Sequence, residues 1–126
     1  MKKILIVEDN EKNMKLVRDI LRHQGHATLE AVTGTDGVRL ALEERPDLVL
    51  MDIQLPDIDG IAVLQEIRRN AALDAVPVVA VSASVMPDEQ QKIVASGFDA
   101  FITKPINLKQ FQETVKRFLA GGRRTP

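Results

Sequence analysis

Five polar residues stand at the ends of short apolar segments, where their side chains could act together. They are Glu8, Asp9, Asp52, Ser82 and Lys104. If the apolar segments are parallel strands, their carboxyl ends meet at one edge of a sheet, which is where such sheets bind ligands. Three carboxylates held close together repel one another unless a proton or a cation intervenes. The spacing therefore predicts a divalent-cation site with a hydroxyl and an amine beside it.

The ligands expected at this site indicate which metal it would hold. All of them are oxygen atoms, and they are too few to enclose an ion completely. This suits Mg²⁺, which keeps several water molecules and can complete its octahedron with a phosphoryl oxygen, whereas Ca²⁺ requires more protein ligands. We expect Mg²⁺ as the cofactor, with Mn²⁺ able to substitute because it accepts the same oxygen ligands.

Asp52 is the residue best placed for covalent chemistry. It directly follows the apolar segment 48–51, so a rigid element would hold its carboxylate, and residues 53–59 would form an open loop beyond it. A carboxylate can attack phosphorus and form an acyl phosphate when a metal and cations neutralise the transferring group. Lys104 would then place a positive charge on the phosphoryl oxygens, and Ser82 would donate a hydrogen bond to one of them.

Each of these residues also has an ordinary structural explanation, since the acids could be helix caps or loop charges. Asp9 or Asn10 could cap the helix that follows them. Ser82 could cap a helix that starts near Pro87, and Lys104 could belong to a turn. Because the acids, the hydroxyl and the lysine occur together at four strand ends, a functional site explains them better than four separate structural roles.

The residues between these positions follow the pattern of alternating strands and helices. Short apolar runs predict strands at residues 4–7, 27–32, 48–51, 76–81 and 100–103. Apolar residues recur at helical spacing between them, most clearly at Leu108, Phe111, Val115, Phe118 and Leu119. Gly25 and Gly97 stand where the first and fourth helices should end. A strand and a helix repeated five times, with right-handed crossovers, predict a doubly wound α/β domain.

Length and composition limit the number of domains and the classes of function. The chain has 126 residues, with 17 Lys and Arg against 18 Asp and Glu, and it has no cysteine. We expect one domain over residues 1–120 and a flexible tail over 121–126. The net charge of −1 predicts neither a nucleic-acid nor a membrane partner, and disulfides and thiolate metal sites are excluded. No apolar run suits a signal peptide or a membrane span, so we expect a cytoplasmic protein.

Four short motifs occur in order along the chain. They are Ile-Val-Glu-Asp-Asn at 6–10, Met-Asp-Ile-Gln-Leu-Pro at 51–56 with Gly60 after it, Ser-Ala at 82–83, and Lys-Pro at 104–105. With these motifs the chain resembles response-regulator receiver domains, and residues 8–16 look most like the single-domain DivK type. The resemblance implies the CheY-like (flavodoxin-like) fold, in which five helices surround a five-stranded parallel sheet of order 2-1-3-4-5.

The resemblance also implies how the acidic residues would act. Asp52 would be the phosphoacceptor, and Asp9 and the backbone carbonyl of Gln54 would join it as metal ligands. Glu8 would contact the metal mostly through water. These roles agree with the cation site expected from the residue types.

Further residues would bind the phosphoryl group and report its presence. Ser82 and Lys104 would bind the phosphoryl oxygens, while Gln54 and Ser84 would flank the group and tune its lifetime. Phe101, which also fits simple core packing, would rotate and change the surface of the fourth helix, fifth strand and last helix, where a downstream protein would dock. Serine at position 82 lacks the β-branch of threonine, so its coupling to Phe101 could be looser.

The function implied is that of a single-domain response regulator in a two-component phosphorelay. A sensor histidine kinase or a histidine phosphotransfer protein would donate its phosphoryl group to Asp52, and the domain would act as a signalling switch rather than as an enzyme. The same sequence could serve as the receiver module of a hybrid histidine kinase, although the start at Met1 and the irregular tail favour a standalone protein.

Two other classes of protein use a similar arrangement. A phosphohydrolase of the haloacid-dehalogenase type also has an aspartate nucleophile at a strand end, but it expects a second acid at the position of Gln54. A flavin or nucleotide binder needs a loop rich in Gly, Ser or Thr after the first strand. Glu8 and Asp9 occupy that place and would repel a phosphate.

Overall fold

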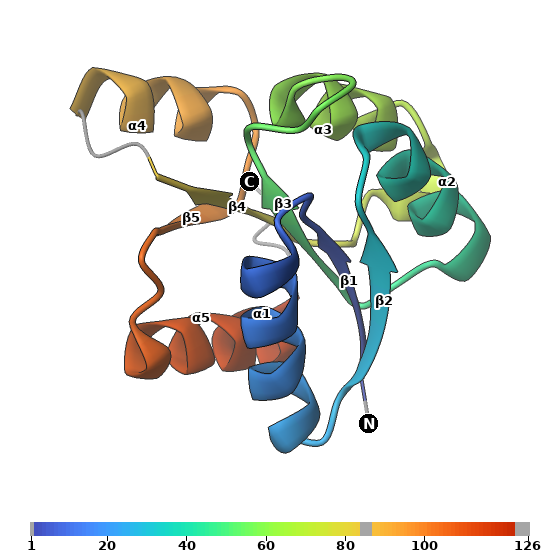
Figure 1. Cartoon of the computed structure of the whole chain (residues 1–126). Coiled ribbons are helices and arrows are strands. Elements are labelled where there is room, and N and C mark those ends of the chain that lie inside the picture. Colours follow the sequence, from blue (N-terminus) through green and yellow to red (C-terminus); the bar gives the residue numbers. More distant parts are fainter. Residues whose placement is uncertain (1, 84–86, 123–126) are drawn as a thin grey trace.

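Five parallel strands form the central sheet of the computed structural model, in the order β2-β1-β3-β4-β5 (Figure 1). The structure describes residues 2–83 and 87–122. The strands are β1 (Lys3–Val7), β2 (Ala27–Ala31), β3 (Leu48–Asp52), β4 (Val78–Ser82) and β5 (Ala100–Thr103). This order confirms the predicted doubly wound sheet, in which the chain reverses its direction of travel between β1 and β3.

Helices cover both faces of the sheet (Figure 1). They are α1 (Glu11–His23), α2 (Gly34–Glu44), α3 (Gly60–Arg68), α4 (Pro87–Ala95) and α5 (Leu108–Gly121), with a short 3₁₀ helix η1 at Ala71–Leu73. Successive residues of β1 point to opposite faces, so Ile4 packs in the cluster under α1 and α5, and Leu5 packs in the cluster under α2, α3 and α4. Burial on both faces explains why β1, β3 and β4 are nearly continuous apolar runs.

The strands end at the residues expected to do chemistry. Asp52 is the last residue of β3 and Ser82 is the last residue of β4. The start of β4 differs from the prediction, because the strand begins at Val78 rather than at residue 76. Pro77 has no backbone N–H for the sheet, and the N–H of Val76 donates to the carbonyl of Leu73 in the preceding turn (3.1 Å).

The helix ends follow the predicted glycine positions. Gly25 has a φ of 90° just after α1, and Gly97 has a φ of 112° just after α4, in the left-handed region that glycine tolerates best. Within the described part of the chain, we find no helix whose length and apolar character would let it span a bilayer.

Candidate functional site

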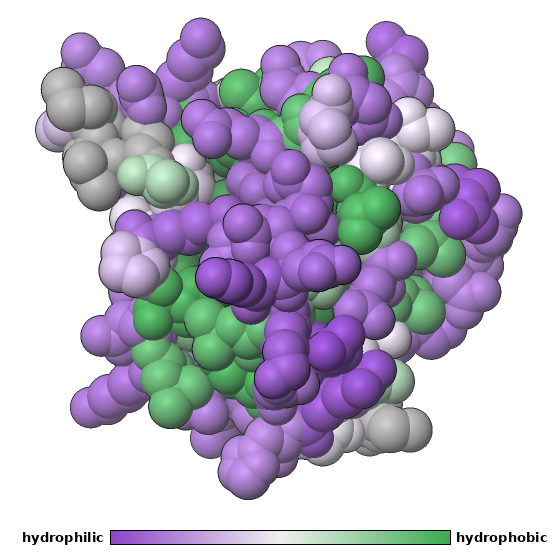
Figure 2. Space-filling view, viewed as in Figure 1, coloured by the Kyte–Doolittle hydropathy of each residue, from purple (hydrophilic) through white to green (hydrophobic). Residues whose placement is uncertain are grey.

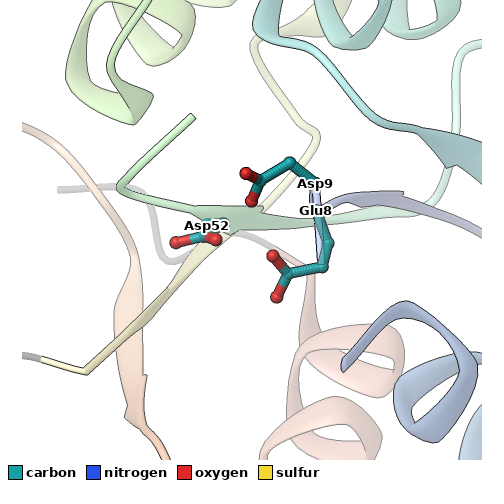
Figure 3. Close-up of side chains that lie close together, drawn as sticks. All are labelled: Glu8, Asp9 and Asp52. Atoms are coloured by element: carbon teal, nitrogen blue, oxygen red, sulfur yellow. The ribbon is translucent and has the colours of Figure 1, made fainter. Parts of the chain in front are cut away.

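Three carboxylates gather where β1 and β3 end (Figure 3). The two strands are neighbours, with Val7 opposite Met51, so the residues that follow them lie side by side. One carboxylate oxygen from each of Glu8, Asp9 and Asp52 lies within 4.8 Å of the others. Glu8 and Asp52 are buried while Asp9 is exposed. The structure therefore brings together the three acids that the sequence placed at one edge of the sheet.

The Asp52 carboxylate is held by two hydrogen bonds. Its Oδ1 accepts from the backbone N–H of Gln54 (3.0 Å), and its Oδ2 accepts from Nζ of Lys104 (3.3 Å). The Asp52 side chain is 8% exposed, so it is nearly enclosed, and it still borders an open pocket. Such fixation favours a defined direction of attack for a carboxylate nucleophile.

Lys104 supplies the positive charge beside the acids. It follows β5, its backbone N–H donates to the carbonyl of Ser82 (2.9 Å), and its Nζ also lies 2.9 Å from Oε1 of Glu8. Burial lowers the pKa of Lys104, but the hydrogen bond to Glu8 and the charge of Asp52 outweigh burial and raise it. The ammonium group therefore stays charged at neutral pH. The Lys104–Pro105 peptide bond is cis.

Glu8 is the acid of this cluster whose pKa is clearly shifted. Its burial, together with the neighbouring Asp52, raises the pKa of Glu8 to about 7, although Lys104 acts in the opposite direction. The charge of two adjacent buried carboxylates is therefore only partly compensated by one lysine. A bound cation would compensate the remainder.

The raised pKa of Glu8 predicts how the stability of the metal-free protein depends on pH. The folded state binds this proton more tightly than the unfolded chain, where the pKa of Glu8 is near its ordinary value of 4.5. We therefore expect the contribution of Glu8 to the free energy of unfolding to fall as the pH rises from about 4.5 to about 7. At higher pH this contribution should stay constant. Urea denaturation in EDTA, at about pH 5 and about pH 8, measures this change.

The matched control for this experiment is Glu8→Gln, which keeps the shape of the side chain and removes its titration. In Glu8→Gln, the free energy of unfolding at the higher pH, relative to that at the lower pH, should be greater than in the wild type. An identical difference in the wild type and in Glu8→Gln would contradict the role assigned to Glu8.

A pocket of about 350 Å³ opens beside the acids. Its lining consists of Glu8, Asp9, Asn10, Asn13, Asp52, Gln54, Leu55, Pro56 and Lys104. One wall is the loop between β3 and α3, which starts at Ile53 and returns to the strand at Gly60. The Gly60 N–H donates to the carbonyl of Ile53 (2.8 Å), and a Cβ at position 60 would lie only 2.7 Å from the carbonyl oxygen of Asp52. Glycine is therefore required where the loop closes.

The donor atoms around this pocket fit a hard divalent cation. Asp9 and Asp52 offer carboxylate oxygens, Glu8 lies behind them, and Gln54 in the loop lines the same space. Oxygen donors of this kind, with open positions for water, match the coordination that Mg²⁺ prefers.

Two of the remaining predicted residues, Ser82 and Phe101, lie on β4 and β5. Ser82 is buried at the end of β4, opposite Thr103 of β5, so it lies at the same edge of the sheet as Asp52. Phe101 lies within β5 and is partly buried, packing against the core under α2, α3 and α4. Ser84 falls outside the described residues.

Two residues near the site could be assigned only with the structure. Asn10 is the cap of α1, because its Oδ1 accepts from the backbone N–H groups of Lys12 (3.0 Å) and Asn13 (3.1 Å). This resolves the choice between Asp9 and Asn10 and leaves Asp9 available for a ligand. Asn13 lies in the first turn of α1 and lines the pocket. Nothing in the sequence indicated Asn13, because Asp9 precedes the helix and the spacing of side chains along a helix does not relate the two residues.

Comparison with protein families and sequences gives a consistent match. A family model described as "Response regulator receiver domain" matches residues 4–116. The polar-differentiation response regulator DivK of Brucella anthropi is 43% identical over 94% of this chain and 96% of its own length. DivK of Brucella ovis is 42% identical over the same shares.

Solved structures show the same architecture. The receiver domain of a sensor histidine kinase from Pseudomonas aeruginosa, which has a magnesium ion coordinated in its active-site cleft, has a TM-score of 0.89 and 29% identity over 95% of this chain and 98% of its own. The receiver domain of a signal transduction histidine kinase from Syntrophus aciditrophicus has a TM-score of 0.89 and 32% identity over 100% of this chain and 96% of its own. The chemotaxis protein CheY4 of Vibrio cholerae shares the fold, with a TM-score of 0.86 and 23% identity over 93% of this chain and 98% of its own.

Proposed function

Since the chain belongs to the response-regulator receiver domain family, we propose that it is a phosphorylation-controlled switch with Asp52 as its phosphoacceptor. Two-component signalling through a phosphorylated aspartate is typical of this family. The observation that carries the assignment to Asp52 is its position at the end of β3, inside the carboxylate cluster and paired with Lys104. Asp9, by contrast, is exposed, whereas Asp52 is buried and held by Gln54 and Lys104.

We assign Mg²⁺ as the cation that this site holds. Asp9, Asp52 and the backbone carbonyl of Gln54 would be its protein ligands, with Glu8 acting mostly through water. When bound, the cation neutralises charge on the transferring phosphoryl group. The uncompensated charge of Glu8 and Asp52 in the metal-free protein supports this assignment.

The proposed reaction is a phosphoryl transfer from a phosphohistidine. An oxygen of the Asp52 carboxylate forms a bond to phosphorus while the bond from phosphorus to the donor nitrogen breaks, and the electron pair of that bond leaves with the imidazole. Lys104 moves from Asp52 to a phosphoryl oxygen, and Ser82 donates its hydroxyl hydrogen to another. The product is an acyl phosphate on Asp52.

The readout would be a changed surface at α4, β5 and α5. An apolar pocket of about 440 Å³ lies there, lined by Pro87, Gln90, Gln91, Val94 and Ala95 of α4 and by Phe101. Movement of Ser82 toward the phosphoryl group would vacate space for the ring of Phe101, and the pocket would change shape. Gln54 and Ser84 would set the lifetime of the phosphate. Such a two-state element needs only a few kcal/mol of differential stabilisation, as is usual for ligand-driven switches.

A histidine kinase or a histidine phosphotransfer protein is the expected donor, as receiver domains act with partners of two-component signalling. An apolar area lies between α1 and α5 on the face shown in Figure 2. Leu16 of α1 is 45% exposed and Leu108 of α5 is 54% exposed. Asn13 in the first turn of α1 and Lys104, which precedes α5 in the chain, both line the pocket. A protein that approaches Asp52 would therefore cover the exposed leucines of these helices.

Phosphorylation by acetyl phosphate tests the proposed function. Incubation with Mg²⁺ should add one phosphoryl group to the intact mass of the wild type, and EDTA should prevent it. Asp52→Ala should show no addition, whereas Asp88→Ala, which removes an exposed acid on α4, should behave as the wild type. Absence of an adduct, also with a phosphorylated histidine donor, would refute the proposal.

A further inference from the structure

Asp57 connects the loop beside the site to α2, a helix that is distant in sequence but adjacent in space. It lies in the loop between β3 and α3, five positions after Asp52, and its carboxylate reaches the first turn of α2. Its Oδ1 accepts from the backbone N–H of Gly34 (2.8 Å). Its Oδ2 accepts from both the backbone N–H (3.0 Å) and the hydroxyl (2.6 Å) of Thr35. One side chain therefore makes three hydrogen bonds to residues more than twenty positions earlier in the sequence.

Helix α2 does not require Asp57 as its own cap. Thr33 already occupies the capping position, and its hydroxyl accepts from the backbone N–H of Asp36 (3.1 Å). The two N–H groups before Asp36 remain for an acceptor from elsewhere, and the positive end of the helix favours a carboxylate there. The contact with Asp57 is thus a tertiary link in addition to a local cap.

Apolar packing reinforces the same link. Ile58, the next residue of the loop, lies against Gly34, where an added Cβ would come within 2.5 Å of the Ile58 side chain. The added atom would also lie 2.7 Å from Val63 of α3. Glycine at position 34 therefore permits the close approach of the loop to α2.

The loop is fixed at three places, and the wall of the pocket lies between two of them. At its start, the N–H of Gln54 donates to Asp52, and at its end Gly60 donates to Ile53. The third place is Asp57. Gln54, Leu55 and Pro56 line the pocket in the segment between Asp52 and Asp57. Without the hydrogen bonds of Asp57, hydrogen bonds would hold the loop only at its start, through Gln54, and at its end, through Gly60.

We propose that Asp57 is a positioning residue for the metal site, which ties the loop to α2 and so holds the backbone carbonyl of Gln54 at the place of the cation. This inference rests on the proposed function, because it assigns Gln54 as a ligand. The hydroxyl of Thr35 and the N–H of Gly34 hold the pKa of Asp57 well below its usual range, so the link is charged across the physiological pH range.

The test is the affinity of the protein for Mg²⁺, measured by titration of ¹⁵N-labelled protein and observation of amide resonances near the pocket, without any phosphoryl donor. Asp57→Ala should raise the dissociation constant by about tenfold, the lower end of the range for residues that orient metal ligands. The amides of Leu55 and Ile58 should also exchange with solvent faster, because the loop is released.

Thr33→Ala is the matched control. It removes the local cap of α2 and should lower the melting temperature, but it leaves the hydrogen bonds of Asp57 in place. Its dissociation constant for Mg²⁺ should therefore stay within about twofold of the wild type. A general loosening of α2 would instead raise the constant in both variants.

Three results would overturn the inference, and they separate its failure from that of the proposed function. Wild-type affinity in Asp57→Ala would refute the positioning role alone, and so would an equal loss of affinity in Asp57→Ala and Thr33→Ala. Absence of Mg²⁺ binding by the wild type would refute the metal site itself and this inference with it.

Discussion

Replacing Lys104 with methionine is expected to slow phosphorylation of Asp52 by about 10²- to 10³-fold, the effect of removing one charged or hydrogen-bonding group that stabilises a transition state. The Nζ of Lys104 lies 2.9 Å from Glu8 and 3.3 Å from Asp52, where a transferring phosphoryl group would arrive. Methionine preserves most of the volume of the side chain and removes its charge. Negative charge that builds up on the phosphoryl oxygens would then have no neighbouring ammonium group.

A second effect of this substitution acts through Glu8. Lys104 lowers the pKa of Glu8 and partly offsets burial and Asp52, so its removal will raise that pKa above about 7. Protonated Glu8 would weaken the attraction for a cation at neutral pH. The rate should therefore be compared at saturating Mg²⁺, so that it reports the phosphoryl transfer.

Time courses of intact mass with acetyl phosphate measure this rate. Lys109→Met, in which an exposed lysine of α5 is removed, provides the control and should react as the wild type does. A rate for Lys104→Met within about threefold of the wild type would show that Lys104 does not stabilise the transition state, since that change is far below the expected loss.

Truncation of Phe111 to alanine is expected to destabilise the fold by about 3 to 5 kcal/mol, the usual loss for an aromatic residue in a packed core. Phe111 is completely buried on the inner side of α5, in the cluster that joins α5 and α1 to the sheet. Its removal would leave a cavity between the helix and the strands, and the surrounding residues would relax only partly.

Urea denaturation of Phe111→Ala and of Leu108→Ala measures the free energy of unfolding of both variants. The comparison separates the effect of removing a buried side chain from the effect of placing an alanine in the helix. Leu108 lies on the same helix but is 54% exposed, so its truncation should change the free energy of unfolding by about 0.5 kcal/mol or less. Similar losses in both variants would contradict the packing described for α5.

The fold was largely predictable because its three central strands, β1, β3 and β4, are buried on both faces. β1 and β3 are therefore continuous apolar runs, and their polar neighbours Glu8 and Asp52 mark the carboxyl ends. The start of β4 was predicted too early, because Val76 is apolar while Pro77 prevents the strand from forming there. Hydrophobicity indicates burial and contains little information on backbone hydrogen bonding.

The candidate site was predictable to the extent that it follows from strand order. The convergence of Asp9, Asp52 and Lys104 at one edge is a consequence of parallel strands. The link from Asp57 to Gly34 and Thr35 was not predictable, because two of its three hydrogen bonds come from backbone N–H groups, whose position depends on how α2 packs beside the loop. No pattern of side chains in the sequence encodes such a contact.

Borohydride reduction of the phosphorylated protein, followed by mass mapping of its peptides, tests the central claim most directly. Borohydride converts an acyl phosphate of aspartate to homoserine, so the chemistry marks the residue that carried the phosphoryl group. The account predicts homoserine at position 52, formed only after incubation with a phosphoryl donor and Mg²⁺. Homoserine at Asp9, or a phosphoryl group that resists reduction while Asp52 stays unmodified, would contradict it.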